Sequence, residues 1–204
     1  MRTSKDTNKQ LLPPILASAS PRRHMWMNTL KIPFEILVPN VDEAPLPGEG
    51  PNKMVERLAC TKAEAVAKDN PDRWIIAADT VVAVDQHTLG KPKTIPNAIK
   101  MLTLIQGRGH TVYTGLCLRR NDVLYTLVDT TEVFMQQMTP DQVSWYVGTG
   151  EPMDKAGAYA IQGIASLFVD KTVGSFATVT GFPVEMFSKL AYRLGLLGLW
   201  LGIP

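Results

Sequence analysis

Apolar positions along the chain follow two different spacings. Residues 15–18 and 74–84 form nearly continuous apolar runs, which predict buried strands, and residues 36–38 predict another strand that runs out into a loop. Residues 51–67 instead place apolar side chains three or four positions apart, which predicts a helix that opens at Pro51. Strand-like runs that alternate with helical segments are typical of an α/β fold. The buried stripe of the predicted helix consists of Val55, Leu58, Ala59, Ala63 and Val66.

Two arginines follow the first predicted strand, at its junction with a helix. In the octet Leu-Ala-Ser-Ala-Ser-Pro-Arg-Arg, Ser20 suits the N-cap and Pro21 the first helical residue. A helix N-terminus carries partial positive charge and free N–H groups, and Arg22 and Arg23 can add bidentate contacts to an anion. The segment predicts a phosphate site, although an ordinary capped helix with two solvated arginines has the same pattern. We expect this helix to bury Met25, Trp26 and Leu30.

Two ionisable residues occupy positions that are predicted to be buried. Lys62 lies on the apolar stripe of the helix over residues 51–67, so its ammonium must reach a carboxylate or a bound phosphate, unless the side chain extends to solvent at the edge of the stripe. Asp79 interrupts the apolar run over residues 74–84. A buried, unpaired carboxylate is strongly disfavoured, so Asp79 needs a lysine, an arginine or a metal ion, or else it caps a neighbouring loop.

Length and terminal composition favour one globular unit. The 204 residues can bury a single core, so we expect one domain over residues 15–204, as one body or two closely joined lobes, after a flexible polar extension over residues 1–14. The extension lacks the apolar segment of a secretory signal, which favours a cytoplasmic protein. The apolar residues 194–204 are too short to cross a bilayer, so we expect them to pack on the fold or on a second subunit.

Charge and side-chain spacing argue against several classes of function. The net charge of +2 indicates no long basic track for nucleic acid. The chain shows neither a Ser-His-Asp order nor a Walker-type lysine loop. Cys60 and Cys117 lie far apart in sequence, which favours buried thiols over a disulfide. His24, His87 and His110 have no metal-ligand spacing, and we expect them on the surface or in loops.

Four segments together resemble the Maf family of nucleoside triphosphate pyrophosphatases. They are the arginine octet, Ala-Asp-Thr-Val-Val at residues 78–82, Leu-Gly-Lys-Pro at residues 89–92, and Asp-Lys-Ala-Gly-Ala-Tyr-Ala-Ile-Gln-Gly at residues 154–163. They occur in the family's order between about residues 15 and 190. The resemblance implies an elongated mixed sheet flanked by helices with a central cleft, as in the Maf and inosine triphosphatase group. It also implies a homodimer.

The same resemblance implies roles for particular residues. Asp79 would act as general base, or hold a Mg²⁺ or Mn²⁺ ion together with Glu43, the acidic loop residue after the second strand. Lys62 and Lys91 would complete the catalytic set. Substrate would contact Ser20, Arg22, Arg23, Thr80, Asp154, Lys155 and Gln162.

Three positions indicate which nucleobase the substrate carries. Members that resemble the dTTP and UTP enzymes carry the residues found here as Arg22, Thr80 and Gln162, so the resemblance implies a pyrimidine triphosphate that is hydrolysed at its α-phosphate to monophosphate and pyrophosphate. Alternatives are a purine-directed enzyme for inosine triphosphate or 7-methyl-GTP, and a nucleotide-binding regulator of cell division without turnover. Two departures from the family pattern, Ala165 for glycine and Phe176 for tyrosine, imply a shifted or broadened base preference.

Overall fold

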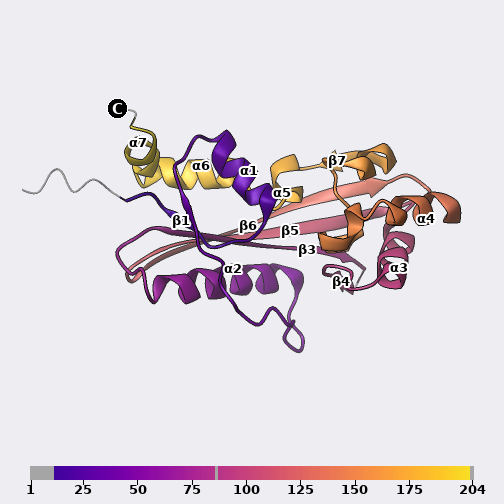
Figure 1. Ribbon diagram of the computed structural model, residues 1–204, viewed down its shortest axis with the longest axis horizontal. Helices are drawn as coiled ribbons and strands as arrows, with labels where there is room; N and C mark the ends of the chain where they lie inside the picture. The colour runs from indigo at the N-terminus through magenta and orange to yellow at the C-terminus, as the bar shows by residue number, and fades with distance from the viewer. Residues whose placement is uncertain (1–11, 86, 203–204) are drawn as a thin grey trace, which may run out of the picture.

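The computed structural model describes residues 12–85 and 87–202. Its centre is one mixed sheet, and Figure 1 shows that β3 (Ile75–Val84), β5 (Gly109–Arg120) and β6 (Val123–Met135) run along its length. Within the described residues the strand order is β2-β1-β3-β5-β6-β7, with β4 (His87–Leu89) also paired to β3. β1 (Ile15–Leu16) is parallel to β2 (Glu35–Ile36) and to β3, and the other pairs, including β6 with β7 (Val169–Val173), are antiparallel. The predicted elongated mixed sheet with flanking helices is confirmed.

Helices cover both faces of the sheet at one end and gather around it at the other. α2 (Pro51–Ala67) lies on one face, opposite α1 (Pro21–Thr29), α5 (Phe176–Val179), α6 (Val184–Arg193) and α7 (Leu196–Leu201) (Figure 1). The far end carries α3 (Ile95–Ile105), α4 (Pro140–Gly148) and three 3₁₀ helices. These are η1 (Glu151–Asp154), η2 (Ala156–Ala158) and η3 (Ile164–Phe168).

One edge of β3 is interrupted, and this interruption locates the cleft. β1 pairs with Ile75 and Ile76 at the start of β3, whereas β4 pairs with residues 82–84 at its end, on the side away from β5. The chain leaves β1 at residue 17 and turns into α1, so the described residues add no strand beside residues 77–81. Asp79 and Thr80 lie in this gap.

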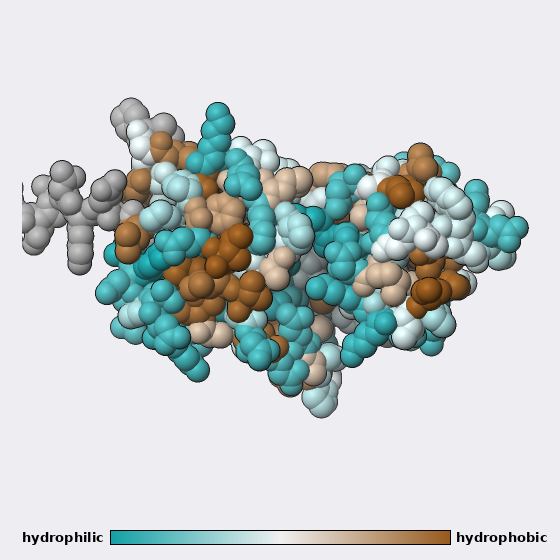
Figure 2. Space-filling view, in the orientation of Figure 1, coloured by the Kyte–Doolittle hydropathy of each residue, from teal (hydrophilic) through white to brown (hydrophobic). Residues whose placement is uncertain are grey.

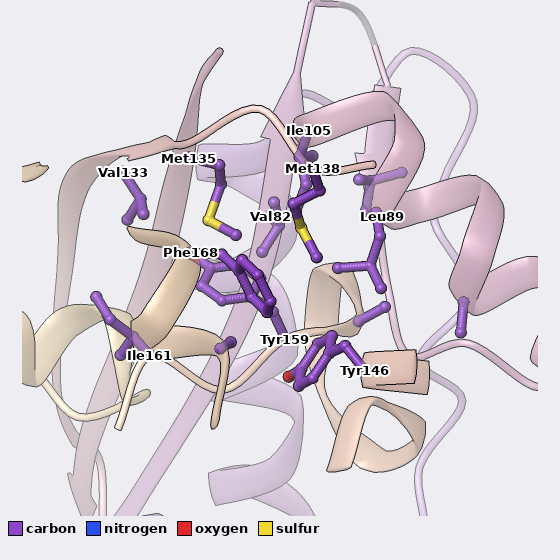
Figure 3. Packing of buried hydrophobic residues seen from close by; sticks show 14 of the residues in the cluster. Val82, Leu89, Ile105, Val133, Met135, Met138, Tyr146, Tyr159, Ile161 and Phe168 are labelled. Carbon is purple, nitrogen blue, oxygen red and sulfur yellow. The ribbon is translucent and has the colours of Figure 1, made fainter. Parts of the chain in front are cut away.

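Separate apolar clusters stabilise the two ends of the molecule. At the end that carries α3 and α4, Val82, Met135, Tyr146, Tyr159 and Phe168 pack together, as Figure 3 shows. At the other end, one cluster fills the space between the sheet and α1, α6 and α7, and two smaller clusters lie beneath α2. Each end is therefore held by its own buried side chains, while the long strands connect them.

The helix over residues 51–67 forms as predicted, and its whole stripe is buried together with Lys62. Its close approach to the sheet depends on Gly115, which pairs with Asp79 across β3 and β5. A Cβ atom at Gly115 would lie 2.4 Å from the carbonyl oxygen of Val55. The glycine thus lets α2 lie close enough for Lys62 to reach the middle of β3.

Some local expectations were wrong. Met25 is 43% exposed and the fully buried methionine of α1 is Met27, because this short helix turns a different face to the sheet. His110 is buried in β5, because alternate residues of this strand face the core and His110 is one of those that point toward the cluster containing Tyr159. His24 is half-buried, and its Nε2 contacts the Ser18 carbonyl at 2.8 Å, while His87 is exposed as expected.

The structure describes part of each chain end and both cysteines. Residues 1–11 of the expected extension lie outside the described residues, whereas the Pro13 and Pro14 carbonyls accept hydrogen bonds from Arg73 and Glu35. The apolar tail packs on its own fold through Leu196 and Trp200, and no described helix is long and apolar enough to span a membrane. Both cysteines are free thiols, Cys117 buried and Cys60 half-buried beside it.

Candidate active site

A cleft of about 1240 Å³ opens at the gap beside β3, which is large enough for a nucleotide. On the face drawn in Figure 2, hydrophilic side chains occupy the middle of the molecule and apolar ones lie to either side. The structure brings together in this cleft all the residues that the sequence assigned to catalysis, substrate and metal. They are Ser20, Arg22, Arg23, Glu43, Lys62, Asp79, Thr80, Lys91, Asp154, Lys155 and Gln162.

Lys62 and Asp79 form the buried ion pair of the cleft. The Lys62 Nζ donates to Asp79 Oδ1 at 2.5 Å, and each residue is 7% exposed. The expectation that each needs an opposite charge is therefore confirmed. Asp79 Oδ2 makes no hydrogen bond with any described residue and is available to accept a proton or a ligand.

Glu43 approaches the same ammonium from the loop after β2. Its Oε1 lies 2.6 Å from Lys62 Nζ, although the Glu43 side chain is 56% exposed. Partial burial favours the neutral acid, but the hydrogen bond and charge of Lys62, with the charges of Lys91 and Arg23, outweigh it and lower the pKa of Glu43. Glu43 is thus kept ionised beside Asp79.

The two carboxylates suit a divalent cation, because they already converge on one positive group. Among the described residues no cluster of three or more potential metal ligands exists, so a protein-only cage is not formed. Mg²⁺ is commonly held by one or two carboxylates together with phosphate oxygens and water. Glu43 and Asp79 could supply that protein share. The metal itself would neutralise developing charge on a bound phosphate.

The Arg23 guanidinium uses most of its donors in hydrogen bonds to other residues of the protein. Its Nε donates to the Gly181 carbonyl at 2.9 Å, one terminal nitrogen to Ser18 Oγ at 3.1 Å and the other to Thr80 Oγ1 at 3.1 Å. Three of its five N–H donors are used in this way, and two remain for a ligand. Arg23 therefore mainly fixes the β1–α1 junction against β3 and the turn between α5 and α6, while its charge still faces Asp79 and Glu43.

Arg22 has the opposite arrangement. Its Nε is buried and makes no hydrogen bond with any described residue. Burial lowers the pKa of this guanidinium despite the opposing attraction of Asp154 and Tyr159. A buried donor without an acceptor is unfavourable, so a ligand atom that accepts from Arg22 would stabilise the site.

Ser20 and the lysine loops complete the rim. Ser20 is the N-cap of α1, but its side chain makes no capping hydrogen bond to the described helix, so the start of α1 stays open toward the cleft. Lys91 lies in the exposed turn after β4. Lys155 contacts Asp154 directly between η1 and η2. These groups place positive charge around the space that a polyanion would occupy.

A narrow pocket of about 10 Å³ opens from the cleft. Arg22, Thr80, Ala156 and Gln162 line both spaces, so they form its mouth. Its interior is formed by five further side chains, Val82, Val112, Tyr159, Ile161 and Val179. Sequence reasoning did not assign these residues to the site, because valines and isoleucines in strands carry no signal beyond burial.

The sequence also gave no indication that Glu151 supports the site. Its carboxylate accepts from the Tyr146 hydroxyl at 2.8 Å and from the backbone N–H groups of Ile164 and Ala165 at 2.9 and 3.1 Å. It thereby anchors the backbone directly after Gln162. Ala165, one of the two departures from the family pattern, fits here without strain, because its φ is not positive.

Phe176, the other departure, lines neither space and is 46% exposed. The hydroxyl of a tyrosine at this position would belong to the surface of α5. The position of Phe176 therefore gives no support to the expected shift in base preference.

Comparison with known proteins agrees with this geometry. The family model described as Maf-like protein matches residues 13–194. The chain belongs to the Maf family. Its curated Maf relatives include a dTTP/UTP pyrophosphatase of Desulfotalea psychrophila, 42% identical over 88% of this chain and 94% of the relative, and one of Myxococcus xanthus, 44% identical over 89% and 92%. A Symbiobacterium thermophilum protein of the same name is 42% identical over 88% and 95%. Among solved structures, the Staphylococcus aureus Ham1 protein matches at a TM-score of 0.44, with 17% identity over 59% of this chain and 70% of that one.

Proposed function

We propose that this Maf-family chain hydrolyses dTTP and UTP to the nucleoside monophosphate and pyrophosphate. The observation that carries the proposal is the Lys62–Asp79 pair, which is buried at the gap beside β3 and faces a cleft rimmed by cations. The names of the Maf relatives support the substrate assignment.

In the proposed reaction, Asp79 takes a proton from a water molecule as that water attacks the α-phosphorus. A new bond forms from the water oxygen to phosphorus, and the bond from phosphorus to the oxygen that bridges the α- and β-phosphates breaks. The leaving pyrophosphate keeps that electron pair. Arg22, Lys91 and Lys155 would neutralise its charge from the rim of the cleft.

Lys62 holds the base in position. Its hydrogen bond to Oδ1 leaves Oδ2 of Asp79 for the water. A Mg²⁺ or Mn²⁺ ion, if bound by Glu43 and Asp79, would supply Lewis-acid stabilisation of the phosphate charge. We also propose a homodimer, on family resemblance alone, and sedimentation of the purified chain tests it.

The decisive measurement is pyrophosphate release from a panel of dTTP, UTP, CTP, inosine triphosphate, 7-methyl-GTP and the common purine triphosphates, with Mg²⁺. We expect release from dTTP and UTP that is lost in Asp79→Asn. Release confined to inosine triphosphate or 7-methyl-GTP would replace the pyrimidine assignment with the purine one. Nucleotide binding without release from any substrate would instead support a regulatory protein.

A further inference from the structure

Glu43 lies on a long irregular segment that needs an anchor to reach the cleft. Residues 37–50, between β2 and α2, form no helix or strand, and most of them are exposed (Figure 1). The Glu43 side chain is 56% exposed, yet its Oε1 lies 2.6 Å from Lys62 Nζ. An ion pair with so exposed a partner contributes little by itself, and an exposed loop opens easily. Other contacts must therefore hold the Glu43 backbone close to Lys62.

Arg57 of α2 supplies such contacts. Its Nε and one terminal nitrogen donate to the two carboxylate oxygens of Glu49, each at 2.6 Å, and the same terminal nitrogen donates to the Ala44 carbonyl at 3.1 Å. Glu49 Oε2 also accepts from the Leu46 N–H at 3.2 Å. One guanidinium thus joins the helix to two points of the segment, one directly after Glu43 and one just before α2. We call Arg57, Glu49 and Ala44 the Arg57 clamp.

The clamp is more rigid than an ordinary surface ion pair. The Glu49 side chain is 8% exposed and that of Arg57 is 28% exposed. Two parallel hydrogen bonds to one carboxylate fix the plane of the guanidinium, which a single contact would not do. Asp42 Oδ1 accepts from the Ala44 N–H at 2.9 Å. Ala44 is therefore held at its N–H by Asp42 and at its carbonyl by Arg57.

The clamp and the cleft share one helix. Arg57 precedes Leu58, which lines the cleft, and Lys62 follows Leu58 by one helical turn. Arg57 itself does not line the cleft, so it acts on the site only through other residues. α2 thus holds the segment at two neighbouring residues, at Ala44 through Arg57 and at Glu43 through Lys62.

We propose that Arg57 is a positioning residue, which holds Glu43 against Lys62 in the cleft. Its bonds to Glu49 and Ala44 do this from outside the cleft. The inference rests on the proposed function, in which Glu43 belongs to the reacting site. Without the clamp, Glu43 would move away from Lys62 while the cations that surround the triphosphate stay in place. Turnover would then depend on an arginine that does not meet the nucleotide.

The variant Arg57→Gln removes the clamp and keeps a polar side chain. Displacement of a reacting group by about 1 Å can cost about 100-fold in rate, so kcat for dTTP should fall about 10- to 100-fold. The KM for dTTP should change less than about twofold, because the cationic rim is untouched. Arg119→Gln is the matched control. It removes the 2.8 Å ion pair between Arg119 and Glu64 of α2, outside the cleft, and should turn over like the wild type.

Two measurements separate positioning from a general loss of structure. In a Glu43→Gln background, Arg57→Gln should change kcat less than about twofold, because the clamp acts through Glu43. In the nucleotide-free protein, amide hydrogen exchange should become faster over residues 40–50 but not over residues 75–84 of β3. If Arg57→Gln does not fold, Glu49→Gln weakens the clamp from its other side and should give the same pattern. If Glu43→Gln has no measurable turnover, the exchange rates decide.

The failures of the two proposals are distinct. A wild type that releases no pyrophosphate from dTTP or UTP would overturn the proposed function, and hydrogen exchange would still test the clamp. With an active wild type, an unchanged kcat in Arg57→Gln, a loss carried by KM alone, or an equal loss in both Glu43 backgrounds would overturn the role of Arg57. Exchange that is unchanged over residues 40–50, or faster throughout β3 as well, would also overturn it.

Discussion

The Lys62–Asp79 pair should respond very differently to loss of either partner. Lys62 contacts two carboxylates, Asp79 Oδ1 at 2.5 Å and Glu43 Oε1 at 2.6 Å. Asp79, by contrast, accepts a hydrogen bond from a single cation among the described residues, which is Lys62. In Lys62→Met, a carboxylate that is 7% exposed loses its hydrogen-bonded partner. In Asp79→Asn, the ammonium keeps Glu43, and the new amide oxygen can still accept its hydrogen bond.

These contacts set the expected magnitudes. Removal of one partner of a buried pair costs about 3–5 kcal/mol of the free energy of unfolding, and the nearby charge of Arg23 places Lys62→Met at the lower end, about 3 kcal/mol. In Asp79→Asn the charged ammonium donates to a neutral amide oxygen and keeps the Glu43 carboxylate, so the change costs about 1 kcal/mol. In the double variant the isolated carboxylate is gone, so its loss should be smaller than the two single losses together.

Urea unfolding of the metal-free and nucleotide-free protein at neutral pH measures these differences, and pyrophosphate release from dTTP measures the chemistry. Asp79→Asn should be nearly as stable as the wild type and nearly inactive, which separates catalysis from folding. Equal destabilisation by the two single variants would refute the reasoning, because it would mean that Glu43 does not stabilise the Lys62 ammonium. Full turnover by Asp79→Asn would remove Asp79 as the base.

Three further perturbations follow from the site. Burial lowers the pKa of His110 to about 4, so the unfolded chain binds a proton first and stability falls as the pH drops below about 6.5. Between about pH 7.5 and 4.5 the wild type should lose about 2.5 kcal/mol more than His110→Gln in urea unfolding, and parallel losses would contradict this. Arg22→Ala removes the buried donor at the mouth of the pocket, and should raise KM for dTTP by at least about tenfold with intact thermal stability; an unchanged KM would exclude the contact. In Gly163→Ala, the new Cβ would lie 2.1 Å from Glu151 Oε2. Displacement of Gln162 should then lower kcat/KM for dTTP and destabilise the protein by about 1–3 kcal/mol, whereas wild-type kinetics would show that the anchor does not position the amide.

The sequence was sufficient for features that depend on local spacing. The stripe of α2, the strand around Asp79 and the inward direction of Lys62 all follow from periodicity, because a helix or strand fixes which side chains share a face. An ionisable residue on such a face implies an opposite charge nearby. The sequence could not say that Lys62 would contact Glu43 as well, since that contact depends on the path of an irregular loop.

Features that depend on pairing between distant strands were not predictable. His110 and Tyr159 are 49 residues apart, and their 2.8 Å contact forms only when the residue after η2 packs into one core with β5. The gap beside β3 likewise results from two strands that pair with opposite ends of the same edge. Neither strand alone carries a signal for the cleft that they leave between them.

The adjacent arginines show most clearly what folding adds to a motif. In the sequence, Arg22 and Arg23 are equivalent cations at one helix start. In the structure Arg23 is 9% exposed and donates hydrogen bonds to Ser18, Thr80 and Gly181. Arg22 Nε has no acceptor among the described residues. Because Arg23 also donates a hydrogen bond to Thr80 Oγ1, this arginine holds one side of the mouth of the pocket in place, while Arg22 keeps a free donor there. A lysine at position 23 could supply the charge but not the three divergent hydrogen bonds, so this position depends on the shape of guanidinium as well as on its charge.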